Sequence, residues 1–387
     1  MTITMGARQS FGLFVSPINT STGLGIVAIS FAMAVGQFVW GASQPIFGAI
    51  ADRHGSARVI VAGGVMLAAG MALTPFATSQ WMLLATIGFL SAAGAGAGSF
   101  SILIGATARR LPPERRGFAA GFVNAGGSFG QFLFAPINQA LIGAFGWVSA
   151  MMTMAAATLL TLPLSRVLRH KPAPTRPAGA PVTSGISLRE QLRIAARDKS
   201  YWCLHAGFFT CGFHVAFLIT HLPGEVQLCG LPAGVAATSI AIIGLANIAG
   251  SLTAGSLGSV YRMKWLLFWT YFTRAAAIAI YLTAPKTPLT FYVFAAVLGF
   301  TWLSTVPPTA GLVAKLFGVR YLATLFGLTL LSHQIGGFFG AWLGGIAVAS
   351  TGNYSWMWYA DIALALGAAF INLPIEEAPL ASRAAPA

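Results

Sequence analysis

Two side chains with anion-binding or acid–base chemistry stand inside strongly apolar stretches of the chain. Arg8 lies in MTITMGARQSFGLFVSP, and His214 lies in TCGFHVAFLITHLP. A guanidinium binds carboxylates through paired hydrogen bonds, and an imidazole exchanges a proton near neutral pH. These residues therefore predict binding of a small anion at Arg8 and proton coupling at His214. In the alternative interpretation, Arg8 extends along its helix to the cytoplasmic surface and His214 is a neutral hydrogen bonder between helices.

A stripe of amides indicates a second set of possible contacts. Asn124, Gln131 and Asn138 follow one another at seven-residue intervals, which places them on one face of a helix. Asn124 and Gln131 are candidates for substrate contact. For Asn138 a hydrogen bond between helices is the preferred interpretation.

A helix break is predicted in TWLSTVPPTAG. Pro307 and Pro308 interrupt the helix and free backbone carbonyls, which puts Trp302 beside the break as a candidate for the pocket. His333 precedes a ladder of glycines, a pattern typical of closely packed helices, and is a further pocket candidate. An ordinary packed kink explains the prolines equally well.

The second arginine inside an apolar stretch, Arg274, has one obvious acidic partner. Asp361 is expected at a similar depth, so the two residues predict a structural ion pair between supporting helices. Cys211 and His214 have the spacing of two metal ligands on one helix, but two ligands are a weak signal. We expect no metal, no cofactor and no catalytic residue, and hence no enzyme.

Composition requires that membrane helices position these residues. The chain of 387 residues is 56% hydrophobic and 8% charged, whereas a soluble domain carries about 25% charged residues. Spans of about 20 apolar residues are predicted at 1–17, 24–51, 58–76, 81–107, 117–143, 147–168, 201–223, 234–259, 264–284, 288–314, 321–348 and 355–374. The predicted fold is an all-α polytopic membrane protein, with twelve transmembrane helices in two pseudo-symmetric six-helix bundles.

The basic residues give the orientation. All but three of the 22 Lys and Arg residues fall on one side of these spans; the exceptions are Arg8, Arg274 and Lys286. By the positive-inside rule that side is cytoplasmic, so the net charge of +14 does not require a nucleic-acid partner. The predicted parts are an N-terminal bundle (1–168), a cytoplasmic linker with an amphipathic helix (169–200), a C-terminal bundle (201–374) and a cytoplasmic tail (375–387).

The two halves resemble each other at an offset of about 206 residues. TMGARQSFGLFVSP pairs with TCGFHVAFLITHLP from Thr210 to Pro223, which sets Arg8 opposite His214. Repeats of this kind are typical of transporters that alternate access to a site between two halves. Since the seventh span begins near Tyr201, the match also predicts that the first helix is truncated at its cytoplasmic end.

The loop after the second span carries a family motif. GAIADRHGSAR, from Gly48 to Arg58, resembles the cytoplasmic signature of the major facilitator superfamily. The resemblance covers essentially the whole chain and implies that Asp52, Arg53 and Arg58 form a cytoplasmic gate. Solvated loop charges are the alternative. The corresponding loop of the second half has Ser259 in place of the Asp.

A second motif narrows the resemblance. RRGFAAGFVNAGGSFG, from Arg115 to Gly130, is similar to the fifth-span signature of monocarboxylate and oxalate/formate carriers. That branch often has a cation in the first span, near Arg8, and an Asp and an Arg one turn apart in the eighth. Here the eighth-span positions are Asn247 and Ser251, so carboxylate binding and proton coupling through those usual residues are not expected.

Together these features predict a multi-pass secondary transporter of the cell (inner) membrane, a monomer that moves a small organic anion with possible proton coupling. A monocarboxylate is the expected substrate, bound by Arg8 and shaped by Asn124, Gln131, Trp302 and His333. The alternative within the same fold is an exporter of amphipathic drugs or metabolites. A sensor or enzyme on this scaffold fits less well, because no signalling domain or cluster of catalytic residues is evident.

Overall fold

The computed structural model describes residues 1–99, 102–103, 113–166, 187–258, 260–318 and 321–378. Within these ranges the side chains of residues 49, 52, 53, 113–121, 124 and 323 lie outside the description. Helices and turns make up the described chain, and every predicted span contains at least one helix.

The N-terminal half contains long helices and several short, broken ones. Its elements are α1 (Thr2–Gln9), η1 (Phe11–Phe14), α2 (Val15–Thr22), α3 (Ile26–His54), α4 (Ser56–Leu73), η2 (Thr74–Phe76), α5 (Gln80–Leu83), η3 (Leu84–Ser91), α6 (Ala92–Ala97), α8 (Pro113–Leu159) and α9 (Thr161–Ser165). The first span runs through α1, η1 and α2, so it ends at Thr22 rather than at the predicted Pro17.

The C-terminal half begins after a short helix, α10 (Leu188–Arg197), which Ser187 caps by accepting from the Glu190 N–H. Its other elements are α11 (Lys199–Leu228), α12 (Ala233–Leu257), α13 (Met263–Thr283), α14 (Pro288–Thr301), α15 (Val306–Phe317), α16 (Leu322–Thr351) and α17 (Ser355–Ile371). Asp198 caps α11 in the same way, with its carboxylate 2.8 Å from the Tyr201 nitrogen.

Eight helical stretches in the described part of the chain are long and apolar enough to cross a membrane. One of them, Ala125–Ser165, has 41 residues and would be roughly 60 Å long as a straight helix, about twice the hydrocarbon thickness. The backbone leaves the helical conformation within it at Gly146, with φ of 79°. Only glycine adopts this angle freely, so the stretch accounts for two crossings.

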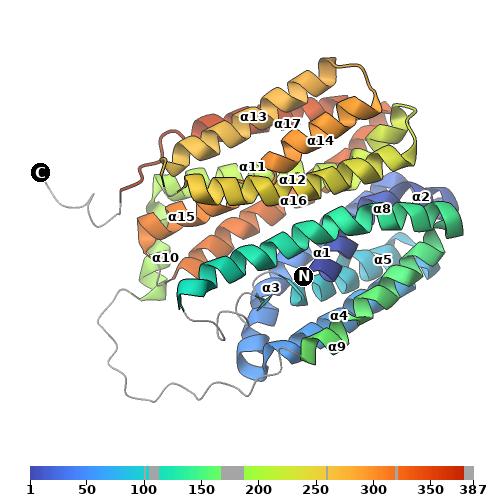
Figure 1. Cartoon of the computed structure of the whole chain (residues 1–387), viewed down its shortest axis with the longest axis horizontal. Helices are drawn as coiled ribbons and strands as arrows, with labels where there is room; N and C mark the ends of the chain where they lie inside the picture. The colour runs from blue at the N-terminus through green and yellow to red at the C-terminus, as the bar shows by residue number, and fades with distance from the viewer. Residues whose placement is uncertain (100–101, 104–112, 167–186, 259, 319–320, 379–387) are drawn as a thin grey trace, which may run out of the picture.

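The two halves lie side by side, and two helix pairs make the largest contacts between them (Figure 1). α3 packs against α16, and α8 packs against α12. At the second contact a Cβ added to Gly244 would lie 2.7 Å from the Ser128 carbonyl oxygen. Glycine therefore allows the two backbones to touch, as in other closely packed membrane helices.

Candidate functional site

A break in the first span positions Arg8. α1 ends at Gln9 and the chain continues as the 3₁₀ segment η1, in which Gly12 packs directly on α11. A Cβ at Gly12 would lie 1.9 Å from the Ile219 carbonyl oxygen, so no larger residue fits there. Short 3₁₀ stretches inside longer helices often mark functional hinges. Here the break lies between the bundles, immediately after the arginine.

Arg8 has two partners on α3. Its guanidinium donates to the side-chain carbonyl of Gln37 and lies over the indole ring of Trp40, 4.2 Å from the centroid. No ion pair between Arg8 and a carboxylate occurs among the residues that the structure describes. An amide and an aromatic face hold the cation in place without neutralising its charge.

A small cavity opens beside Arg8. Its volume is about 30 Å³, enough for roughly two water molecules. Its walls come from α1, η1, α3, η3, α6 and α11, and include Arg8, Phe11, Gln37, Ser91 and Ile219. The η3 wall is a π-helix of eight residues, a conformation that is rare and frequent at functional sites.

The histidine predicted opposite Arg8 does not face this cavity. α11 contributes Ile219 to the cavity wall, whereas His214 lies inside the C-terminal half. Its Nδ1 is 2.5 Å from Oδ2 of Asp361 on α17. The exposed fractions are 1% for His214 and 0% for Asp361. His214 and Asp361 thus form a fully buried carboxylate–imidazole pair.

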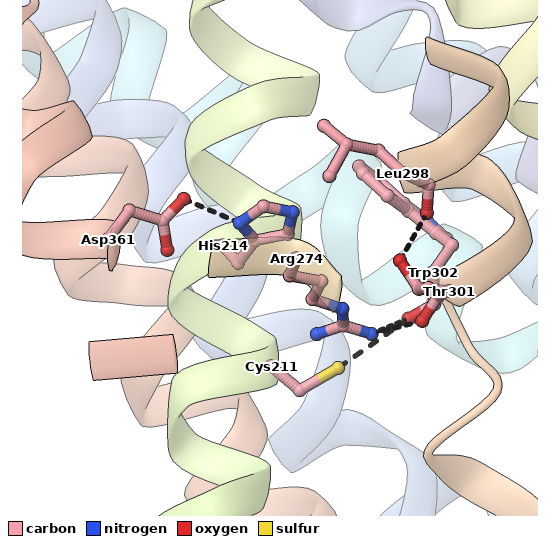
Figure 2. A network of polar contacts seen from close by, with 7 residues as sticks. All are labelled: Cys211, His214, Arg274, Leu298, Thr301, Trp302 and Asp361. Carbon is pink, nitrogen blue, oxygen red and sulfur yellow. Dashed lines mark hydrogen bonds and ion pairs between the residues drawn. The ribbon is translucent and has the colours of Figure 1, made fainter. Parts of the chain in front are cut away.

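The predicted ion pair between Arg274 and Asp361 is wrong, because each residue has another partner (Figure 2). Arg274 donates through one nitrogen, Nη2, to the carbonyls of Thr301 and Trp302, the latter at 2.6 Å. These carbonyls are free because the helix is interrupted between α14 and α15. Backbone dipoles therefore contact one nitrogen of the buried cation, whereas Nε and Nη1 have no hydrogen-bond partner among the described residues. The carboxylate is left to His214.

The helix break itself lies slightly earlier than the sequence indicates. Residues 302–305 separate α14 from α15, and Pro307 and Pro308 stand in the first turn of α15. Proline is well tolerated there because the first N–H groups of a helix have no intrahelical acceptor. The Trp302 indole is buried, with its ring centroid 6.1 Å from that of His214. Trp302 therefore packs in the C-terminal half and is absent from the wall of the Arg8 cavity.

His333 and Gln131 are likewise separate from the Arg8 cavity. His333 on α16 lies against Phe208, with ring centroids 5.2 Å apart, and its Nδ1 is 3.4 Å from Nε2 of Gln334. Gln131 is buried on the face of α8 that meets α12. Its amide has no hydrogen-bond partner among the described residues. The side chain of Asn124 lies outside the described residues.

The proposed gate residues are only partly described. Asp52 and Arg53 belong to the last turn of α3, but their side chains lie outside the description. Arg58 is exposed in the first turn of α4. The gate therefore stays a prediction.

Gln37, Trp40 and Ser91 are site residues that sequence reasoning missed. Gln37 and Trp40 stand three residues apart on α3, so one helical face presents both to Arg8. A glutamine within an apolar span was the available signal. Ser91, the last residue of the π-helix, gave no signal, because serines are common in small-residue helices.

Asn247, at one of the two lost charges of the eighth span, has a structural role. Its Nδ2 donates to the Ser128 hydroxyl at 2.9 Å, and its Oδ1 accepts from the Leu303 N–H at 3.0 Å. One amide thus connects α12 to the helix break and to α8 of the other half.

Comparisons with known proteins agree with this architecture. The family model described as Major Facilitator Superfamily matches residues 1–340. Monocarboxylate transporter 13 of Rattus norvegicus is 27% identical over 357 residues, which cover 91% of this chain and 81% of that protein. The Oxalate:formate antiporter of Oxalobacter formigenes is 25% identical over 359 residues, covering 92% and 84%.

Solved transporters share the fold. A bacterial homolog of the human lysosomal transporter Spinster, in an inward-facing and occupied conformation, superposes with a TM-score of 0.75 at 16% identity, covering 100% of this chain and 96% of that one. The D-xylose-proton symporter gives a TM-score of 0.70 at 14% identity, covering 97% and 96%. The chain therefore has the twelve-helix, two-bundle fold, and it belongs to the major facilitator superfamily as a membrane transporter related to monocarboxylate and oxalate:formate carriers, not as an enzyme.

Proposed function

We propose that this transporter moves a small organic anion, a monocarboxylate in the first instance, by alternating access of its two bundles to the cavity at Arg8. The carrying observation is the partly buried guanidinium, held by Gln37 and Trp40 and lacking an acidic partner among the described residues. An arginine at this depth costs about 3 to more than 10 kcal/mol unless it is solvated or paired. A substrate carboxylate supplies that pairing through two hydrogen bonds.

The cavity at Arg8 is so small that the proposal requires a conformational change before substrate can bind. About 30 Å³ holds roughly two waters, which is too little for a carboxylate and its carbon chain. The bundles 1–168 and 201–374 must therefore move apart at the α3–α16 and α8–α12 contacts for substrate to reach Arg8. Asn124, Gln131, Trp302 and His333 join the site, in this proposal, only in such an opened conformation. Asp52, Arg53 and Arg58 close it on the cytoplasmic side.

The setting follows from the charge distribution and the relatives. We place the protein in the inner membrane as a monomer, with residues 169–200 and the tail 375–387 in the cytoplasm, because the basic residues cluster there. The similar proteins include monocarboxylate transporters and an oxalate:formate antiporter. This supports an organic anion, rather than an amphipathic drug, as the substrate. A proton is the proposed co-substrate, with His214 as the coupling residue.

Uptake into proteoliposomes tests the function. Radiolabelled formate, acetate, lactate, pyruvate and oxalate are offered to purified protein, with and without an inside-alkaline pH gradient. We expect uptake of at least one of them well above that of protein-free liposomes, and its loss in Arg8→Gln. Arg197→Gln, an exposed arginine on α10, is the matched control and should transport normally. If none of the five anions moves, the proposed function is wrong.

A further inference from the structure

The C-terminal half contains a second group of ionisable side chains, away from the Arg8 cavity. His214 and Cys211 come from α11, Asp361 from α17, Arg274 and Tyr271 from α13, and His333 from α16. All are at most 9% exposed. Ionisable groups buried at membrane depth are costly and usually serve a proton or ion pathway. Figure 2 shows His214 between Asp361 on one side and the Arg274–Trp302 contact on the other.

The His214–Asp361 pair can take one additional proton, because Nε2 of His214 and Oδ1 of Asp361 both lack a hydrogen-bond partner among the described residues. When imidazole is neutral, its Nδ1–H donates to Oδ2 of the carboxylate across the 2.5 Å contact. Nε2 then retains a lone pair, and it has no hydrogen-bond partner among the described residues. A hydronium ion transfers its proton to Nε2: one O–H bond of hydronium breaks, the Nε2–H bond forms, and a water molecule is left. The pair then consists of imidazolium and carboxylate.

The surrounding groups fix the charge of this cluster. Arg274 is cationic and offsets the Asp361 carboxylate when His214 is neutral. Tyr271 donates its hydroxyl to the Gly207 carbonyl at 2.5 Å, and Cys211 lies 3.4 Å from the Thr305 hydroxyl. His333, on α16, contributes a second imidazole, and the break between α14 and α15 contributes only neutral groups. Within the cluster the charges of Arg274 and Asp361 offset each other, and a proton on His214 adds one positive charge.

We propose that the His214–Asp361 pair is the proton-carrying site of the transporter, and that its single proton offsets the charge of one bound carboxylate. The inference rests on the proposed function. The eighth-span Asp of the similar carriers is Asn247 in this chain. In this inference a pair formed by the seventh and twelfth spans takes its place as the proton site.

The charges explain why the two ligands travel together. The empty carrier has one uncompensated positive charge, on Arg8. Carboxylate neutralises Arg8 and the proton adds one charge at His214, so the fully loaded carrier again has one. A carrier with only one of the two ligands differs in net charge by one unit from both the empty and the doubly loaded carrier. Moving this additional charge through a low-dielectric interior costs free energy. Empty and doubly loaded states therefore reorient easily, and transport is electroneutral with one proton per carboxylate.

The variant Asp361→Asn is expected to keep exchange of substrate across the membrane and to lose accumulation driven by a pH gradient. Removing the carboxylate leaves Arg274 uncompensated and imitates the protonated charge state permanently. The substrate-loaded variant then reorients, and the empty one does not. With radiolabelled lactate as the probe, we expect exchange at equal pH within about threefold of wild type. Wild type should accumulate lactate about tenfold for each unit of an inside-alkaline pH gradient, and Asp361→Asn should not accumulate it.

The controls keep the test decisive. His221→Gln changes a buried histidine on the same helix whose Nε2 contacts the Ala341 carbonyl at 2.7 Å, and this variant should keep pH-driven accumulation. Removing one member of a buried pair can destabilise the fold. If Asp361→Asn shows no exchange, the double variant His214→Gln/Asp361→Asn takes its place. Its two amide side chains are uncharged and can hydrogen-bond to each other.

Three outcomes contradict the inference, and they differ. Accumulation of lactate to the wild-type level by Asp361→Asn, or by the double variant where it takes its place, excludes the pair as the proton site and leaves the proposed function intact. Wild-type protein that exchanges no carboxylate at all rejects the proposed function, and this inference with it. A potassium diffusion potential made with valinomycin should leave wild-type uptake unchanged, and potential-driven accumulation contradicts the charge balance.

Discussion

At the scale of single residues, Arg8 is defined by what surrounds it. An amide oxygen and an indole ring hold the guanidinium, and neither neutralises it. A carboxylate placed at Gln37 would change this, because it would pair with Arg8 inside the protein and compete with substrate.

Gln37→Glu is therefore expected to lower the apparent affinity for the transported carboxylate by tenfold or more. A tenfold change corresponds to about 1.4 kcal/mol of binding free energy. The readout is the substrate concentration at half-maximal uptake. Gln227→Glu, at an exposed position near the end of α11, is the matched control and should leave this concentration unchanged. Equal affinities in Gln37→Glu and wild type would mean that substrate does not pair with Arg8.

The sequence could identify individual charges and not their partners. Arg8, Arg274, His214 and Asp361 are visible because apolar stretches surround them. Which atoms they meet depends on helix rotation and on the break at 302–305, and one turn of error changes the partner. For this reason the expected Arg274–Asp361 pair is wrong, and Gln37 was overlooked.

At the scale of elements, the broken helix α14–α15 is the feature that organises the C-terminal half. Its free carbonyls accept from Arg274, and its Leu303 N–H donates to Asn247. The prolines in the sequence predict a break to within about one helical turn. They carry no information on which side chains satisfy the freed groups.

Asn247→Ala should destabilise the protein because it leaves the Leu303 N–H without an acceptor. An unsatisfied buried donor costs about 1–3 kcal/mol. We expect a lower midpoint of thermal unfolding in detergent, measured by intrinsic fluorescence. Ser128→Ala removes only the other hydrogen bond of the same amide and should lower the midpoint less. An unchanged midpoint in Asn247→Ala would show that this bridge is not needed for stability.

At the scale of the whole molecule, apolar run lengths predict the number and order of the spans, and basic loops predict their orientation. The structure and the comparisons agree with the expected fold, because the signal of each span is a sum over many residues. Errors of a few residues, such as the longer first span, do not change them. The contacts between the halves could not be predicted from the sequence. The need for glycine at positions such as Gly244 is evident only when the facing backbone is in place.

The orientation can be tested by labelling cysteines in intact cells. In a Cys229→Ser background, Lys286→Cys should react with a membrane-impermeant maleimide added outside. Arg193→Cys, on α10 with a side chain 62% exposed, should react only after permeabilisation. The background substitution is needed because Cys229 follows the end of α11 on the Lys286 side. Labelling of both positions from outside would contradict a cytoplasmic linker.

The central claim, that Arg8 binds the substrate carboxylate, is tested most directly by isothermal titration of purified protein. The two ligands are the carboxylate selected by the uptake panel and its carboxamide, which differ mainly in charge. A hydrogen bond to a charged group is worth about 1.5–3 kcal/mol, so wild type should favour the carboxylate by at least tenfold in Kd. Arg8→Gln should bind both ligands with similar, weak affinity. An undiminished preference for the carboxylate in Arg8→Gln would contradict the account.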